Sequence, residues 1–292
     1  MEFLKSIPIL SQVLLAENAG MTFLEAIPIL KNGILGCFVT GVVSAYLGVY
    51  MILRRMVFVS AALSQVSALG LAFAFLLGTL SGLETGETVH HAMPLLFAGL
   101  AALLLAYQSS EKRMTRESLL GIGYALPAGL VLLILDKISG ETHEIDNILF
   151  GNTVFVSTAQ LLFLLGTAAA VLGIHFIYYK PFVFTAYDPD TARAAGLPTL
   201  FYNQLFFMTV ALTISVSISS IGALPVFGLM VMPAAASLKM THRLKSTFLL
   251  SLTFGGLSAL IGFYLSFLYD LPTGAAILAT SGLWLIIGIF RR

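Results

Sequence analysis

The chain has 292 residues, of which 58% are hydrophobic and only 10% are charged. A core of this length cannot hide that much apolar surface, so the composition excludes a water-soluble globular protein and predicts an all-α, polytopic membrane protein. The formal net charge of +1 gives no sign of a nucleic-acid partner, and a single cysteine, Cys37, excludes an intrachain disulfide and a thiolate metal cluster.

The first 22 residues differ from the rest of the chain. FLKSIPIL at 3–10 recurs as FLEAIPIL at 23–30, and the apolar run of the first copy is too short to cross a bilayer. It also lacks the basic start and small-residue cleavage site of a signal peptide. We expect residues 1–22 to be an extension, either an interfacial helix or a stretch upstream of a start at Met21, and residues 23–292 to be the transmembrane domain.

Apolar windows long enough to cross a hydrocarbon core of ~30 Å follow one another along this domain. They fall at 30–52, 57–79, 92–109, 119–136, 155–178, 200–221, 222–240, 246–268 and 274–290. Several are short or closely linked, so the sequence predicts eight or nine spans.

One polar segment, PFVFTAYDPDTARAAGLPT at 181–199, interrupts the apolar runs. Pro181 is interpreted as a stop, Asp188 and Pro189 as a helix start with carboxylates in the first turn, and Gly196 as the end after about two turns. Such a segment is out of place in so apolar a chain unless it lies in water against another protein. We therefore predict a docking helix on the membrane surface near 187–197.

The charges of the loops indicate the side on which this helix lies. If it is cytoplasmic, alternation of the spans places twelve of the fifteen basic residues in cytoplasmic loops. They are Arg54, Arg55, Lys112, Arg113, Arg116, Lys180, Arg193, Lys239, Arg243, Lys245, Arg291 and Arg292. The outer loops are mostly acidic, with Glu84, Glu87, Asp136, Glu141, Glu144, Asp146 and Asp270 opposed by Lys137. This bias follows the positive-inside rule and predicts nine spans with the N-terminus outside.

Few residues or motifs are candidates for nucleotide binding, catalysis or metal binding. The sequence has no GxxxxGK[ST], HExxH or GxSxG motif, so an ATPase that powers transport would be on another chain. In an outer loop, Glu87, His90 and His91 could bind zinc or manganese, because Glu87 and His91 have i, i+4 spacing; solvated loop residues explain them equally well. A second outer cluster, made of Glu141, His143, Glu144 and Asp146, is equally ambiguous.

Inside the spans, Gln65 is the one strongly polar side chain at depth in the second window, and Ser64 and Ala61 lie near it. Small and hydroxyl residues at this density also form helix-packing surfaces. These three residues are therefore candidates for a translocation path, with helix packing as the alternative.

Five motifs occur together in the C-terminal 270 or so residues. They are LGVYMILRRM (47–56), ILFGN (148–152), YDPDTARAAG (187–196), IGALPVFGLMVMPAAAS (221–237) and YDLPTGA (269–275). In this order they resemble segments of the permease subunits of ABC importers for zinc, manganese and iron, the ABC-3 family. The resemblance runs from about Met21 to the C-terminus.

The resemblance implies a type II ABC importer-like homodimer in the bacterial cytoplasmic (inner) membrane. Two ABC ATPase subunits would bind inside and an extracytoplasmic metal-binding protein would deliver cargo outside. The subunit would be no enzyme itself and would bind no resident cofactor, with ATP held by the partner and a divalent metal as cargo. The family's coupling segment maps onto Asp188, Pro189, Ala192 and Gly196.

The sequence departs from the family where cargo should be recognised. The family's second span typically reads GDAxSHAxLPG, whereas this chain reads SAALSQVSALG at 60–70, with Ala61 at the Asp position, Gln65 at the His position and Leu69 at the Pro position. An amide and a methyl group cannot replace a carboxylate and an imidazole as metal ligands. Three hypotheses follow: a divalent-metal permease selected by its binding protein, a permease for a metal chelate or small organic solute, and a non-transporting protein that docks an ATPase.

Overall fold

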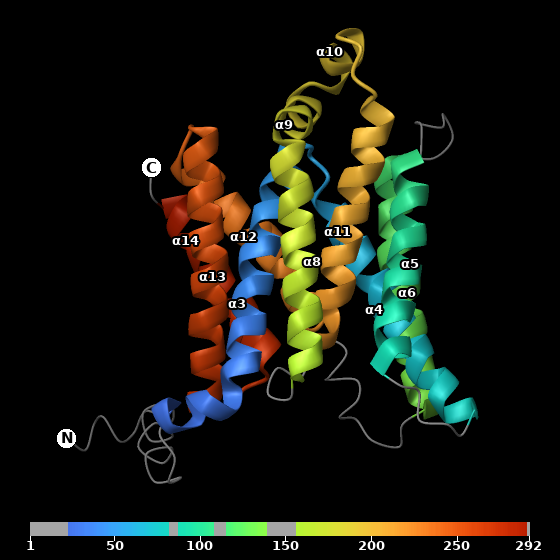
Figure 1. Ribbon diagram of the computed structural model, residues 1–292, viewed down its shortest axis with the longest axis vertical. Coiled ribbons are helices and arrows are strands. Elements are labelled where there is room, and N and C mark those ends of the chain that lie inside the picture. The colour runs from blue at the N-terminus through green and yellow to red at the C-terminus, as the bar shows by residue number, and fades with distance from the viewer. Residues whose placement is uncertain (1–22, 82–86, 108–114, 139–155, 291–292) are drawn as a thin grey trace, which may run out of the picture.

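The computed structural model describes residues 23–81, 87–107, 115–138 and 156–290, and these residues form helices joined by short connections (Figure 1). The helices are α3 (Phe23–Leu53), α4 (Val57–Ser81), α5 (Glu87–Tyr107), α6 (Arg116–Ile138), α8 (Thr158–Ile177), α9 (Tyr179–Tyr187), α10 (Pro189–Ala194), α11 (Thr199–Ile221), α12 (Ala223–Met240), α13 (Leu244–Tyr269) and α14 (Thr273–Phe290). The predicted N-terminal extension at 1–22, the ILFGN motif and the cluster from Glu141 to Asp146 lie outside the described residues.

Nine of the described helices are long and apolar enough to cross a membrane. They coincide closely with the nine predicted windows, which confirms the all-α, multi-pass architecture. A helix satisfies all its backbone hydrogen bonds internally, as a lipid environment requires. The two short helices, α9 and α10, overlap the polar segment at 181–199, and α10 is the part that lies within the predicted docking helix near 187–197.

The long helices run roughly along one axis, and α10 extends beyond them at one end of the bundle (Figure 1). We call this end, which also contains the α3–α4 and α12–α13 connections, the α10 end. Basic residues of the described chain gather there: Arg54, Arg55, Lys180, Arg193, Lys239, Arg243 and Lys245. The α11–α12 and α13–α14 connections lie at the opposite end, so the arrangement of the helices agrees with the predicted alternation of the loops.

Small residues allow α3 to pack closely against its neighbours in the C-terminal half. A Cβ atom on Gly41 would lie 2.6 Å from the carbonyl oxygen of Gly255 on α13. One on Gly48 would overlap the carbonyl oxygen of Met230 on α12. Without water to drive association, such close backbone contact supplies much of the packing energy between membrane helices.

Hydroxyl groups join α4, α5 and α11 in the other half of the bundle. Ser67 on α4 donates to the hydroxyl of Ser215 on α11 at 3.2 Å, and Ser215 donates to the carbonyl oxygen of Pro94 on α5 at 3.1 Å. Both serines are fully buried. This network fixes α4, and with it the 60–70 segment, against two neighbouring helices.

Candidate functional site

The helix start at Asp188 is a complete N-cap. The backbone N–H of Thr191 donates to Oδ1 of Asp188 at 2.9 Å, and the Thr191 hydroxyl donates to Oδ2 at 2.5 Å. Pro189 follows at the first helical position, where its missing N–H would have had no partner. The two hydrogen bonds from Thr191 lower the pKa of the Asp188 carboxyl from its ordinary value of 3.8, so the cap is charged at neutral pH.

The end of α10 is as well defined as its start. The N–H of Leu197 donates to the carbonyl of Ala192 at 3.1 Å, and that of Gly196 donates to the carbonyl of Arg193 at 3.0 Å. This is a Schellman motif, and it needs the left-handed backbone that Gly196 adopts at φ 82°. Ala192 is the buried residue of the helix, and the rest of α10 is exposed. The predicted docking helix is therefore a short, stiff, capped element whose outer surface is free in the isolated subunit.

The predicted stop at Pro181 is wrong in detail. The preceding span ends earlier, at Ile177, and Pro181 lies in the first turn of α9. A proline is tolerated there because the first N–H groups of a helix have no intrahelical acceptor. The chain thus reaches α10 through an extra helix rather than through a loop.

An aromatic cluster fixes α9 to the membrane helices. The Phe182 ring is fully buried and stacks on the ring of His175 from α8, with centroids 4.5 Å apart. Tyr50 of α3 lies against the His175 ring at 5.2 Å. The hydroxyl of Thr209 donates to the Phe206 carbonyl at 2.7 Å, so it accepts from Nε2 of His175 at 3.0 Å. This cluster, Tyr50, His175, Phe182, Phe206 and Thr209, joins α9 to α3, α8 and α11.

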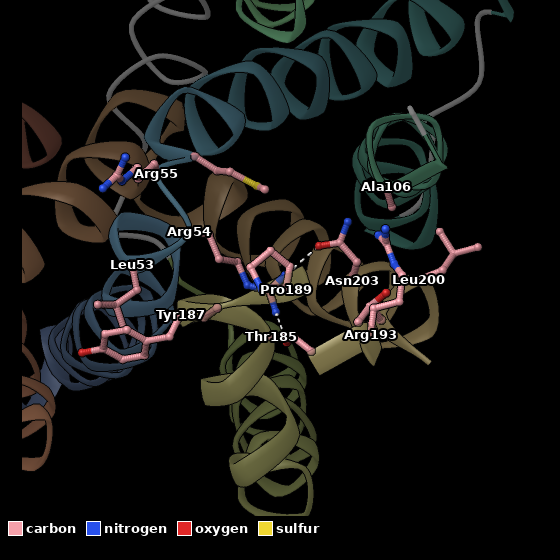
Figure 2. Close-up of a pocket in the computed structure, with 13 residues that line it drawn as sticks. Leu53, Arg54, Arg55, Ala106, Thr185, Tyr187, Pro189, Arg193, Leu200 and Asn203 are labelled. Atoms are coloured by element: carbon pink, nitrogen blue, oxygen red, sulfur yellow. Dashed lines mark hydrogen bonds between the residues drawn. The ribbon is translucent and has the colours of Figure 1, made fainter. Parts of the chain in front are cut away.

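Arg54 makes a second connection between the same helices. Its guanidinium donates to Oδ1 of Asn203 on α11 at 2.6 Å and to the hydroxyl of Thr185 on α9 at 3.1 Å (Figure 2). It also lies over the Phe206 ring, 4.3 Å from the centroid. Beside it a cavity of about 650 Å³ opens next to α10. Its lining residues are Leu53, Arg54, Arg55, Met56, Ala106, Thr185, Ala186, Tyr187, Pro189, Arg193, Thr199, Leu200 and Asn203.

The candidate path residues on α4 are inside the subunit. Ala61, Ser64 and Gln65 have exposed fractions of 3%, 1% and 4%. The Ser64 hydroxyl and Oε1 of Gln65 have no hydrogen-bond partner among the described residues. The placement of these three residues on the translocation path stays a prediction, and a path that uses them would have to open within the subunit.

The two candidate histidines at the opposite end lie against rings of different helices. The ring of His90 lies against Phe75 of α4, with centroids 4.7 Å apart, and the ring of His91 lies against Phe163 of α8, at 5.5 Å. Glu87 begins α5, and its side chain is outside the described residues. Among the described side chains, no group of three His, Cys, Asp or Glu residues is placed to hold a metal ion.

A family model describes this architecture. The model of the ABC 3 transport family matches residues 26–292. The chain belongs to the ABC 3 transport family. The family resemblance seen in the motifs is thus confirmed over nearly the whole chain.

Individual relatives agree with this family. The chain is 26% identical to the manganese transport system membrane protein MntC of Halalkalibacterium halodurans, over 89% of this chain and 86% of that protein. It is 25% identical to the chelated iron transport system membrane protein YfeD of Yersinia pestis, over 90% of this chain and 86% of that one. Among solved structures, PsaBC from Streptococcus pneumoniae in complex with Fab superposes with a TM-score of 0.78 and 25% identity, covering 92% of this chain and 94% of that chain.

Sequence reasoning missed the residues that connect α10 to this ABC-3 bundle. His175 was not among the candidate residues, and Arg54 was predicted only as a positive charge in a loop. One signal was available: Tyr46, Tyr50 and Arg54 recur at intervals of four, which places them on one face of a helix. That spacing identifies the face but not its partners on α8, α9 and α11.

Proposed function

We propose that this chain is the membrane-spanning permease subunit of an ATP-driven importer for a divalent metal ion, zinc, manganese or iron. It works as a homodimer, with an ABC ATPase on the α10 end of each subunit and an extracytoplasmic binding protein at the opposite end. The subunit hydrolyses no ATP itself. The observation that carries the proposal is α10, a six-residue helix capped at both ends that extends beyond a nine-span ABC-3 bundle.

The geometry of α10 suits the transmission of motion. A force applied by an ATPase to this helix passes through α9 to the aromatic cluster, because Phe182 is buried among side chains of α3, α8 and α11. The Arg54 hydrogen bonds add a second connection from α9 to α3 and α11. Rigid contacts of this kind need no chemistry from α10 itself, so a compact helix with a small buried residue is sufficient.

The names of the relatives support a metal as cargo, and manganese most directly, since the Halalkalibacterium relative is named for manganese transport. The α4 segment supports only a neutral path, because Ala61 and Gln65 provide neither a carboxylate nor an imidazole. In this proposal the binding protein selects the ion, and the permease provides a passage without strong ligands.

A metal chelate is the second candidate cargo. The neutral, hydroxyl- and amide-bearing residues at Ser64 and Gln65 are better suited to a complex whose metal is already coordinated than to a bare cation. The Yersinia relative, named for chelated iron transport, favours the same alternative. A small organic solute would use the same neutral path.

Uptake measurements test the proposal and separate the cargoes. Cells lacking this gene, cells carrying it and cells carrying the Gly196→Ala variant should be grown under manganese limitation and then under zinc and iron limitation, and their metal contents compared. We expect the intact gene to restore the content of one metal and the Gly196→Ala variant to restore less of it. Restoration only when a chelator is supplied with the metal would favour the chelate, and equal metal contents in all strains would contradict the proposal.

A further inference from the structure

A second cavity at the α10 end lies between α3, α8, α9 and α13 and shares no lining residue with the cavity beside α10. It is an open groove of about 740 Å³. Its polar side chains are Tyr46, Tyr179, Lys180 and Lys245, and the remaining lining residues, with Phe176 and Phe248 the largest of them, are apolar. All of them belong to the described ranges 23–81 and 156–290, and none is an Asp or a Glu.

The groove lies where two membrane spans end. The span of α8 ends at Ile177 and that of α13 begins at Leu244, and Figure 1 shows both of these ends at the α10 end of the bundle. Lys180 and Lys245 therefore lie at the boundary between the apolar spans and water. Lysines at such a boundary keep their charged groups in the headgroup region while their stems cover apolar surface, and tyrosines are enriched at the same level.

Bulky apolar side chains are exposed on the membrane side of the two lysines. Phe176 and Ile177 have exposed fractions of 85% and 72%, and Leu249, one turn further into α13 than Lys245, has 71%. In a span these side chains face acyl chains rather than water. The groove is thus basic on its aqueous side and apolar on its membrane side, which is the polarity of a phospholipid.

The walls of the groove are formed by packed rings. The ring of Phe248 lies 5.2 Å from that of Tyr46 and 6.3 Å from that of Tyr179, measured between centroids. Lys180 and Lys245 are both exposed, and neither forms an ion pair within the described part of the chain. Two lysine ammonium groups beside rigid aromatic walls attract an anion, and phosphate is an anion that lysine binds well.

We propose that this groove binds an anionic phospholipid, with its phosphate between Lys180 and Lys245 and its acyl chains over Phe176, Ile177 and Leu249. Basic pockets between membrane helices bind lipid headgroups in this way. A second copy of the chain is a poorer occupant, because a two-fold contact centred on this groove would bring the lysines of both copies together. The bound lipid joins α9, at the base of the docking helix, to α13. The inference goes beyond the proposed function and requires no ATPase.

Lipid affinities test the groove in the purified permease. Native mass spectrometry should measure the binding of phosphatidylglycerol and of phosphatidylcholine to wild type, to Lys180→Gln combined with Lys245→Gln, and to the control Lys239→Gln. Lys239 is an exposed lysine at the same end that does not line the groove. We expect wild type and the control to prefer phosphatidylglycerol and the double variant to bind it roughly tenfold more weakly. Lys180→Arg combined with Lys245→Arg should keep the preference.

Equal affinity of wild type for the two lipids would overturn the proposal, and so would a double glutamine variant that binds phosphatidylglycerol like wild type. A photoreactive phosphatidylglycerol with a diazirine in its acyl chain locates the site. Peptides that contain Phe176, Ile177 or Leu249 should carry the label. Label confined to other faces of the bundle would show that the groove is covered by something else, such as a second copy of the chain.

One further measurement separates the lipid from the ATPase subunit as the occupant. In nanodiscs of phosphatidylcholine alone, wild type and the double glutamine variant should bind the purified ATPase subunit with equal affinity. A loss of affinity in the variant, where no anionic lipid is present, would assign the two lysines to the ATPase and overturn the lipid site. If wild type prefers phosphatidylglycerol as expected and yet binds no ATPase, the proposed function fails and the lipid site stands.

Discussion

The 187–197 segment around α10 and the 60–70 segment of α4 occupy opposite environments in this permease. The first is exposed, and its shape is set locally by the Asp188 cap and the Schellman motif at Gly196. The second is buried among α5, α6 and α11, and the Ser64 hydroxyl and Oε1 of Gln65 have no hydrogen-bond partner among the described residues. The 187–197 segment resembles the coupling segment of the family. The 60–70 segment lacks the Asp and His that the family's second-span pattern contains.

The difference separates two tasks of the proposed transporter. Docking to an ATPase subunit requires a helix of defined shape, and capping of the backbone at both ends of α10 supplies that shape with few side chains. Recognising a metal ion requires charged or imidazole ligands, and α4 has none near Gln65. We infer that this subunit is equipped for coupling and leaves cargo selection to the binding protein. The following predictions test the two sides of this comparison, from the largest expected effect to the smallest.

The largest effect should come from restoring ligands on α4. Ala61→Asp places a carboxylate at a site with a 3% exposed fraction, where an unpaired charge costs several kcal/mol, so we expect a strong loss of thermal stability. Adding Gln65→His one turn away should let zinc or manganese restore that stability. Thermal unfolding of the purified permease with and without each ion measures both effects.

Two outcomes would contradict this prediction. A stable Ala61→Asp variant would mean that the position is hydrated, as an open path would require. A double variant that gains neither stability nor heat of binding on titration with metal would place the pair away from any site where the two side chains can share an ion. Ala61→Ser is the matched control for the change in volume.

The next effect concerns the anchor of α9. Phe182→Ala removes a fully buried ring from the aromatic cluster and should cost about 3–5 kcal/mol of stability. Phe182→Leu, which keeps most of the volume, should fold and yet transport less cargo for each ATP hydrolysed, because α9 is held less rigidly. The ratio of transport to hydrolysis in proteoliposomes is the measurement.

Phe184 provides the control for this anchor. It lies two residues further along α9 with an exposed fraction of 37%, so Phe184→Leu should leave the ratio unchanged. Equal effects of the two leucine variants would show that the buried stacking of Phe182 on His175 does not carry the coupling.

A smaller effect is expected at the caps of α10. Asp188→Ala removes both hydrogen bonds to Thr191 and should destabilise the start of α10. Gly196→Ala forces a side chain into the left-handed region at a cost of about 1–2 kcal/mol. Transporters assembled with either variant should move less cargo for each ATP that the ATPase subunit hydrolyses, since a frayed α10 transmits less motion. Asp190→Ala, an exposed carboxylate in the same turn, should behave like wild type; coupled transport in the Asp188 and Gly196 variants would count against the docking role.

The smallest effect is in the pH dependence of docking. The pKa of Asp188 is lowered in the folded subunit, so its cap stabilises α10 above the ordinary range of aspartate and is lost only as the pH falls through the lowered value. Wild-type permease and the Asp188→Asn variant each bind the ATPase subunit with a measurable affinity. Between about pH 5 and 8 the ratio of these two affinities should be constant. A ratio that falls steadily from pH 8 to pH 6 would show that a different group provides the cap.

The sequence alone was sufficient for the features that depend on short-range physics. The nine spans follow from the lengths of apolar runs, because a helix in lipid needs no partner to satisfy its backbone. The caps at Asp188 and Gly196 follow from residues at most a few positions apart. Even there, Pro181 was misinterpreted, because a proline can start a helix as readily as it can stop one.

Only the tertiary structure decided which distant side chains meet. Arg54 reaches Asn203 and Thr185 across more than 130 residues, and His175 lies among rings from three other helices. Hydrophobic periodicity is weak in a helix that is apolar on every side, so the sequence could not show which face of each span points inward. The burial of Gln65, the divergence of His90 and His91, and the arginine cavity beside α10 all depend on those faces, and packing alone determines them.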